Sequence, residues 1–370
     1  MVIFATIWAV LYAGLIGIAC GLWMYQSRNP KQLIPGQKAQ EFTLIVPFRN
    51  EANHLPLLIQ CLNQQTFPRQ QWECIFVDDH STDNSLLAFN APINFKYRVI
   101  QGTGDGKKAA LNEAISYASN DHIIQTDADC TCSPSWLESI AQASYDTDPT
   151  VITGPVAIAP SHTLFDHFQA MDMMALMGIT FTGIRTGWWS MGNGANMSYP
   201  GSLREDATLH MKGQEYASGD DMFLIEHATK MKQGHIHFLF DEAAIVHTPP
   251  CPDIKSFMQQ RLRWAGKNAA MSTIGLKLTL IVCLGFNILL VAIVVRSVFN
   301  HEYISITLIL WMQKWMIDYF YLKILASFFK TSIPLLQYLF SAVLYPFYAC
   351  LISLMSIFKR NYEWKGRVTR

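Results

Sequence analysis

The sequence predicts an α/β domain with a mostly parallel sheet, combined with membrane-spanning helices, on three observations. Of the 370 residues, 51% are hydrophobic and only 15% are charged, whereas soluble domains carry roughly 25% charged residues. The apolar stretches are residues 2–25 and most of 278–358, while residues 28–270 read as an ordinary globular sequence. In that middle region short apolar runs alternate with helical patterns, which is typical of a parallel sheet covered by helices. The formal net charge of zero argues against a nucleic-acid partner, because no basic field would attract phosphates.

The N-terminal run, residues 2–25, is uncharged and long enough to cross about 30 Å of hydrocarbon. A secretory signal would need a basic start, and only Met1 precedes the run. The triplet that ends at Cys20 resembles a lipoprotein cleavage site, so a cleaved signal stays the alternative. We expect a retained transmembrane helix over residues 1–27.

Residues 28–250 are expected to form the α/β domain. Strands are expected at 42–46, 72–77, 98–101 and 122–126, and helices at 53–63 and 107–119. Polar clusters follow the first, second and fourth strands, at 49–51, 78–79 and 127–129. Because ligands of such sheets bind beyond the carboxyl ends of the strands, the sequence predicts a binding site at this edge.

Two features of this edge suit a phosphorylated ligand. Lys107 opens a helix after the glycine-rich loop 102–106, and a helix N-terminus with a cation favours phosphate. Asp127 and Asp129 are two apart on an extended segment, so both carboxylates point to one side. Two such carboxylates suit a divalent cation, Mg²⁺ or Mn²⁺. A flexible surface turn is the alternative for the first feature, and a solvated loop or helix cap for the second.

Another helix is expected from Ser218 to about Gln233, with Gly234 as its C-cap. Asp220 and Asp221 stand in its first turn, where the helix dipole favours acidic residues whatever their function. The functional interpretation is a general base directed at an acceptor hydroxyl.

Residues 251–277 are expected to form an interfacial helix. Gln260, Arg263 and Trp264 are spaced i, i+3 and i+4, so they share one helix face. That face combines an amide, a planar cation suited to phosphate and an aromatic platform. Arg and Trp are also typical of helices that lie at lipid headgroups, and the two interpretations are compatible.

Residues 278–358 are expected to hold two or three membrane segments, within 278–295, 303–326 and 333–358. Lys314 and Asp318 lie in the second segment at i and i+4, where they can neutralise each other. Basic residues flank 28–277 at both ends, which predicts that this region is cytoplasmic. The basic tail, 359–370, favours the same side, so we expect segment 303–326 not to cross.

Six motifs occur in order along the chain. They are Pro47–Glu51, Val77–Asp83, Gly106–Asn112, Asp127–Asp129, Asp220-Asp221 and Gln260–Trp264, the last reading Q-R-L-R-W. Together they resemble the membrane-bound branch of the family 2 inverting glycosyltransferases, whose catalytic domain has the GT-A fold, a Rossmann-like mixed sheet. Asp220 stands where that family usually has Glu.

The resemblance implies a metal-dependent hexosyltransferase that takes a nucleotide-diphosphate sugar, expected to be a UDP-sugar. The donor-binding residues would be Arg49, Glu51, Asp78, Asp79, Lys107, Asp127 and Arg263. Asp127 and Asp129 would hold the divalent cation. Asp221 would take the proton of the acceptor hydroxyl, with Asp220 as the other member of the catalytic pair.

The resemblance places Gln260, Trp264 and Asn196 on the acceptor side, Asn196 within the loop 187–196. The small number of membrane segments, and a W-K-G-R sequence at 364–367 that resembles the ending of bacterial lipid-type relatives, favour a membrane lipid as acceptor and therefore glycolipid synthesis. A processive synthase of a cell-surface polysaccharide is the alternative.

Two other classes remain as alternatives. A catalytically silent membrane partner is disfavoured because every charged position that the reaction needs is present, and a transporter because the predicted cytoplasmic domain is large. The expected location is the bacterial inner membrane, with the catalytic domain in the cytoplasm.

Overall fold

The computed structural model describes residues 2–29, 41–147, 150–160, 163–210, 220–231, 234–270, 273–358, 362–364 and 367–369. The chain divides into two compact units. The helical unit comprises residues 1–30, 160–189 and 250–360, and the sheet unit comprises 31–159, 190–249 and 361–370. The expected N-cap, Ser218, and part of the expected basic tail lie outside the described residues.

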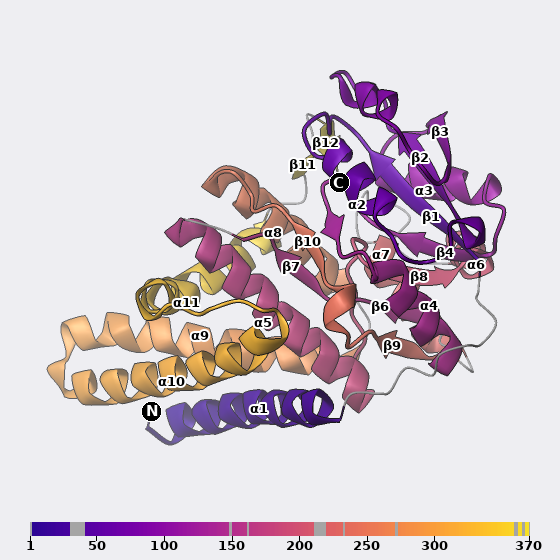
Figure 1. The fold of residues 1–370 in the computed structure, drawn as a ribbon. Helices are drawn as coiled ribbons and strands as arrows, with labels where there is room; N and C mark the ends of the chain where they lie inside the picture. Colours follow the sequence, from indigo (N-terminus) through magenta and orange to yellow (C-terminus); the bar gives the residue numbers. More distant parts are fainter. Residues whose placement is uncertain are drawn as a thin grey trace. The chain divides into compact units, whose positions relative to one another are not determined.

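The sheet unit is built on a seven-stranded mixed sheet in the order β3-β2-β1-β4-β8-β6-β9, whose strands β3, β2 and β1 can be followed in Figure 1. The strands are β1 (Phe42–Phe48), β2 (Trp72–Asp78), β3 (Lys96–Gln101), β4 (His122–Gln125), β6 (Val151–Thr153), β8 (Met197–Pro200) and β9 (Ile236–Phe238). The first four are parallel to their neighbours among themselves, whereas β8 is antiparallel to both β4 and β6. Every residue of β1 and β2 is buried, as apolar runs in the middle of a covered sheet require. The predicted mixed α/β fold is confirmed.

Helices connect these strands. They are α2 (Leu55–Asn63), α3 (Lys107–Ser116), α4 (Trp136–Thr147), α6 (Gly201–His210) and α7 (Asp220–Lys230), with 3₁₀ turns at Arg69–Gln71, Ser85–Asn90 and Glu242–Ala244. In α2 the buried positions recur with helical spacing, at Leu55, Leu58, Ile59 and Leu62, so this face packs into the core. A smaller sheet joins β5 (Thr131–Cys132), β10 (Val246–Thr248) and β7 (Val156–Ile158), and β11 (Tyr362–Trp364) pairs with β12 (Arg367–Thr369).

Within its described residues, the helical unit contains long helices and one 3₁₀ turn, His301–Tyr303. The helices are α1 (Val2–Arg28), α5 (Leu164–Thr186), α8 (Ile254–Ala270), α9 (Ile274–Phe299), α10 (Ile304–Phe328) and α11 (Leu335–Phe358). Three described segments are long and apolar enough to cross a membrane: Ile3–Arg28, Ile274–Phe299 and Leu335–Phe358. These helices are consistent with a membrane protein, and the orientation remains a prediction.

Helix α10 is not one of those three segments, although it lies beside α9 (Figure 1) and packs against α1, α5, α9 and α11. Its charged residues explain this. Lys314 is 1% exposed and donates to Oδ2 of Asp318, so the predicted pairing of these two residues is confirmed. The hydroxyl of Tyr12 donates to Oδ1 of Asp318 at 2.5 Å, which ties the charged pair of α10 to α1.

Helix α5 is an element that the sequence analysis did not anticipate. It lies inside the range 28–250 expected for the catalytic domain, but it packs against α1, α10 and α11 and belongs to the helical unit. Both ends of this helix are marked by residues that commonly begin or end helices. The Asp166 N–H donates to the Thr163 side chain at 3.0 Å and the Thr163 N–H donates to the Asp166 carboxylate at 3.2 Å, which is a capping box. Gly187, with a φ of 71°, ends the helix in the left-handed conformation.

Candidate active site

The carboxyl ends of β1 and β2 are adjacent, since these strands are parallel neighbours. Nη1 of Arg49 donates to the backbone oxygen of Asp79 at 2.9 Å, and the N–H of Gly106 donates to Oδ1 of Asp79 at 3.1 Å. Asp79 is 1% exposed. The two strand ends and the glycine-rich loop before α3 therefore meet at Asp79, at the sheet edge where the sequence predicts a ligand site.

Two further predicted donor-binding residues, Asp78 and Glu51, are buried at the same edge. Oδ1 of Asp78 accepts from the N–H of Ser81 at 2.9 Å, so this side chain caps the turn that follows β2. Glu51 lies 2.8 Å from Nδ1 of His54, and its backbone N–H donates to the Ser85 hydroxyl at 2.7 Å. Both carboxylates therefore help to shape the turns that border the site.

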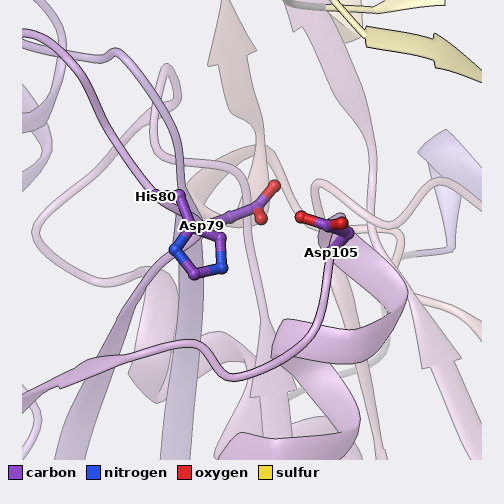
Figure 2. A group of neighbouring side chains, drawn as sticks. All are labelled: Asp79, His80 and Asp105. Carbon is purple, nitrogen blue, oxygen red and sulfur yellow. The ribbon is translucent and has the colours of Figure 1, made fainter.

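Asp79, His80 and Asp105 place three potential metal-ligand atoms within 4.8 Å of one another. Figure 2 shows the carboxylates of Asp79 and Asp105 directed toward each other, with the His80 ring beside them. His80 and Asp105 are exposed, and exposed acidic groups often cluster without an ion. No local sequence pattern points to this group, because Asp105 belongs to the loop before α3 and only the fold brings it to the end of β2.

A second cluster surrounds Gly194, in the loop before β8. Lys107, the first residue of α3, forms an ion pair with Oδ1 of Asp127. The N–H of Gly194 donates to Oδ2 of Asp221 at 3.1 Å. A Cβ atom at Gly194 would lie 3.3 Å from Nζ of Lys107 and 3.5 Å from Cβ of Asp221. Lys107 and Asp221, which come from separate parts of the sequence, therefore meet at one glycine, and Asp127 joins them through its ion pair with Lys107.

The end of β4 holds the Gly194 loop in place. Nε2 of Gln125 donates to the Gly194 oxygen at 3.0 Å, and the Thr126 hydroxyl donates to the Ala195 oxygen at 2.7 Å. The hydroxyl of Tyr199 in turn donates to Oε1 of Gln125 at 2.8 Å. The sequence did not lead us to predict a role for Gln125. The signal was present, because Gln125 is a polar residue at the end of an apolar strand, two positions before Asp127.

Asn196 is the anchor of this loop and is 1% exposed. Its Oδ1 accepts from the indole N–H of Trp136 at 3.1 Å. Its Nδ2 donates to the backbone oxygens of Pro155 at 2.9 Å and of Ala244 at 2.8 Å. All three bonds are internal to the sheet unit, so the structure gives Asn196 a supporting role. The acceptor contact implied by the resemblance stays a prediction.

Asp127 and Asp129 follow β4 as predicted, and both are half-buried. Asp127 is paired with Lys107, and Oδ1 of Asp129 lies 3.6 Å from Sγ of Cys130. These carboxylates are hard oxygen donors, the ligand type that fits Mg²⁺ or Mn²⁺. Asp220 begins α7, and its side chain lies outside the described part of the structure.

Gln260, Arg263 and Trp264 lie on α8 in the helical unit, with the predicted spacing along one face, and all three are half-buried. The remaining predicted site residues belong to the sheet unit. Oε1 of Gln260 accepts from Nη1 of Arg261 at 2.7 Å, and the Arg261 guanidinium lies 4.2 Å from the centroid of the Trp264 ring. Arg261 is thus in contact with two of the three residues.

Comparison with known proteins identifies the family of the sheet unit's sequence. The sequence pattern of the family "Glycosyl transferase family 2" matches residues 43–197. A 4,4'-diaponeurosporenoate glycosyltransferase from Staphylococcus haemolyticus is 32% identical over 152 residues, 39% of this chain and 39% of the relative. An undecaprenyl-phosphate 4-deoxy-4-formamido-L-arabinose transferase from Yersinia enterocolitica is 32% identical over 123 residues, 31% of this chain and 38% of the relative. The matches thus span about two fifths of each relative's length.

Among solved structures, a mannosyltransferase PcManGT from Pyrobaculum calidifontis, in complex with GDP-Man and Mn²⁺, has a TM-score of 0.51 and 15% sequence identity. The likeness covers 96% of both chains and supports the same fold. The family match includes the residues from Arg49 to Asp129 but ends before Asp221 and before α8. On these grounds the chain carries a glycosyl transferase family 2 domain with the GT-A fold, in the same chain as a unit of long apolar helices.

Proposed function

We propose that this protein is an inverting glycosyltransferase that transfers a hexose from a nucleotide-diphosphate sugar, a UDP-sugar, to a membrane lipid. The observation that carries the proposal is the meeting of Lys107 and Asp221 at Gly194, with Asp127 paired to Lys107, at the carboxyl edge of the sheet. A cation for phosphate, a carboxylate for a metal ion and a carboxylate that can serve as a base are the groups that this transfer needs.

Donor binding is assigned to the edge formed by β1, β2 and the loop before α3. Arg49, Glu51, Asp78 and Asp79 would bind the nucleoside, because polar groups at this edge face the ligand position of a parallel sheet. Lys107 would contact the diphosphate from the N-terminus of α3, where the helix dipole adds to its charge. Arg263 is proposed as a second cation for the diphosphate, because its guanidinium can bind phosphate through two N–H donors.

Asp221 is proposed to take the proton from the acceptor hydroxyl. Its two carboxylate oxygens accept from the N–H groups of Gly194 at 3.1 Å and of Met222 at 2.8 Å. These two bonds fix the direction of the carboxylate, and a general base works only when it is held toward the proton it removes. The hydroxyl oxygen would then attack the anomeric carbon on the side opposite the diphosphate, which inverts the configuration there.

Asp127 and Asp129 are proposed to hold Mg²⁺ or Mn²⁺, since both offer carboxylate oxygens at the end of β4. A bound divalent cation would neutralise charge on the departing diphosphate. Lys107, paired with Asp127 in the structure, would lie next to the same phosphates. The Asp129→Ala variant should therefore lose transfer, and calorimetric titration with UDP should lose its dependence on Mn²⁺. UDP binding that responds normally to Mn²⁺ in this variant would refute the metal assignment.

The lipid acceptor is supported by the three segments that are long enough to cross a membrane. The Yersinia relative also supports it, because the name of that protein includes undecaprenyl-phosphate, which is a lipid phosphate. Gln260 and Trp264 are proposed to contact the acceptor, with the Trp264 ring as a stacking platform. The catalytic unit is proposed to lie on the cytoplasmic side of a bacterial inner membrane, where nucleotide sugars are made.

The deciding experiment uses the full chain in native-lipid nanodiscs, supplied with Mn²⁺ and a panel of radiolabelled UDP- and GDP-sugars. Products are separated into an organic-soluble fraction and a gel-excluded fraction. Label in the organic fraction, with a UDP-sugar as the best donor, is the expected result. Label in the high-mass fraction would instead assign a polysaccharide synthase, and absence of any nucleotide release across the panel would assign a silent partner. Preference for a GDP-sugar would refute the UDP assignment alone.

A further inference from the structure

The helical unit contains a buried cation that the proposed reaction does not use. Arg261 on α8 is 5% exposed, and its Nε donates to Oδ2 of Asp172 on α5 at 2.8 Å. Burial by itself lowers the pKa of Arg261, but the charge and hydrogen bond of Asp172, together with Tyr348 and Cys251, more than offset this, so the pKa lies above its ordinary value. The guanidinium therefore keeps its charge, and the ion pair fixes where it lies between α5 and α8.

The guanidinium of Arg261 contacts two aromatic rings of its own helix. Its central carbon lies 4.6 Å from the centroid of the Phe257 ring and 4.2 Å from that of Trp264. Phe257, Arg261 and Trp264 are spaced i−4, i and i+3, which places all three on one face of α8. A planar, delocalised cation stacks on such rings, whereas the compact ammonium of Lys has no plane to stack.

Arg261 also determines the position of the neighbouring amide. Nη1 of Arg261 donates to Oε1 of Gln260 at 2.7 Å. One guanidinium therefore contacts both side chains that are proposed to bind the acceptor, through a hydrogen bond to Gln260 and a ring contact to Trp264. Asp172, from a helix far away in the sequence, holds that guanidinium.

We propose that Arg261, held by Asp172, is a positioning residue that fixes Gln260 and Trp264 in the orientation that receives the acceptor. This inference rests on the proposed acceptor role of those two residues. Arg261 acts through its neighbours and does not itself contact the donor or the reacting atoms. Loss of Arg261 should therefore affect use of the acceptor much more than hydrolysis of the donor by water.

The kinetic test compares Arg261→Lys, Trp264→Ala and the double variant, as full chains in nanodiscs. Arg261→Lys should raise the KM for the acceptor roughly tenfold or more, because an ammonium group has neither the plane that stacks on a ring nor the fixed fork of N–H donors that reaches Asp172 and Gln260 together. Donor hydrolysis should change less than about twofold, because Arg261 is proposed to contact neither the donor nor the reacting atoms, and substitutions away from a site usually have effects within about 0.5 kcal/mol, a factor of about two. In the double variant the acceptor KM should be close to that of Trp264→Ala alone, since residues that act through one another are not additive. Fully additive effects would overturn the proposal.

The control is Arg296→Ala on α9, which removes another arginine stacked on an aromatic ring, with its guanidinium 4.6 Å from the centroid of Tyr303. This control should leave the acceptor KM unchanged, and an equal rise in both arginine variants would overturn the specific role of Arg261. Asp172→Asn should raise the acceptor KM by part of the increase expected for Arg261→Lys. Asp172→Glu, which keeps the carboxylate, should have an acceptor KM closer to that of the wild type. An acceptor KM for Asp172→Glu no lower than that for Asp172→Asn would count against Asp172 as the anchor.

A second readout does not depend on activity. The protein is labelled with 5-fluorotryptophan, and the Trp264 resonance is identified by its absence in Trp264→Phe. Arg261→Lys should shift or broaden this ¹⁹F line and leave the other tryptophan lines in place, and an unchanged line would overturn the positioning role. The Trp264→Ala arm tests the proposed function separately: normal acceptor use by that variant would refute the acceptor role of Trp264, whatever the fluorine spectrum of Arg261→Lys.

Discussion

The backbone N–H of Gly194 donates a hydrogen bond of 3.1 Å to Oδ2 of Asp221, across 27 positions of sequence. Oδ1 of the same carboxylate accepts from the N–H of Met222 at 2.8 Å. Because both oxygens are held by backbone donors, the direction of the Asp221 side chain is set by the loop before β8 and by the first turn of α7. The conformation of that loop thereby becomes part of the proposed chemistry.

Substituting Asp221 by Asn should slow transfer at least about 100-fold, the usual contribution of a general base. The Asn oxygen can still accept from Gly194, so donor binding should be unchanged in calorimetric titration. Glu226→Gln is the matched control, because it neutralises a carboxylate of the same helix that pairs with Lys230. The base assignment would be abandoned if Asp221→Asn kept a tenth of the wild-type rate or more.

Substituting Gly194 by Ala should lower donor hydrolysis by at least about tenfold, because overpacking a filled site forces neighbouring side chains to move. The new Cβ would lie 2.6 Å from Nε2 of Gln125 and 3.3 Å from Nζ of Lys107. Gly17→Ala on α1 is the control, because a Cβ there meets nothing within 4 Å. Steady-state release of UDP measures both variants, and equal rates would show that the Gly194 loop is not part of the site.

Substituting Lys314 by Met should destabilise the helical unit by up to about 3 kcal/mol, the lower end of the cost of breaking a buried ion pair, because the Asp318 left behind is only half-buried. Asp318 accepts hydrogen bonds from Lys314 and from the Tyr12 hydroxyl, and in the variant the Tyr12 bond would remain. Thermal unfolding in detergent, followed by size-exclusion chromatography, measures the loss. The double variant Lys314→Met with Asp318→Leu should recover part of it, and a double variant less stable than the single one would refute a pairing role.

Stability of the sheet unit should depend on pH through His122. Burial, opposed by the charge of Asp121, lowers the pKa of His122 from 6.5 to about 4, and the neutral ring packs 5.0 Å from that of Phe42. Between pH 6.5 and 4 the unfolded chain binds the proton and the folded chain does not, so stability falls as pH falls through this window. The loss amounts to roughly 3 kcal/mol, because the pKa of His122 is 6.5 in the unfolded chain and about 4 in the folded one.

The variant His122→Gln removes this titration while it keeps a polar side chain beside Ser144, whose hydroxyl lies 3.3 Å from Nε2 of His122. The difference in Tm between wild type and variant is measured from pH 7.5 to pH 4. Wild type should lose stability faster on the acid side, and identical slopes in the two proteins would contradict the assigned shift.

Much of the site could be predicted because its residues come directly after strands. Apolar runs such as Phe42–Phe48 must be buried, and the first polar residues beyond them lie at the edge of the sheet. Arg49, Asp79 and Asp127 were found in this way. Asp105 and Gln125 were not, because their importance depends on contacts with the end of β2 and with Gly194 that no local pattern records.

Local signals in the sequence are enough to predict the buried strands, the long apolar helices, and the pairing of Lys314 with Asp318 one helical turn away. Which segments pack together becomes visible only in the folded structure. It assigned α5 to the helical unit, turned Asn196 inward to bond Trp136, and brought Gly194 to Asp221. Such contacts join positions far apart in the chain, and their free energy depends on neighbours that exist only once the sheet and the helices have assembled.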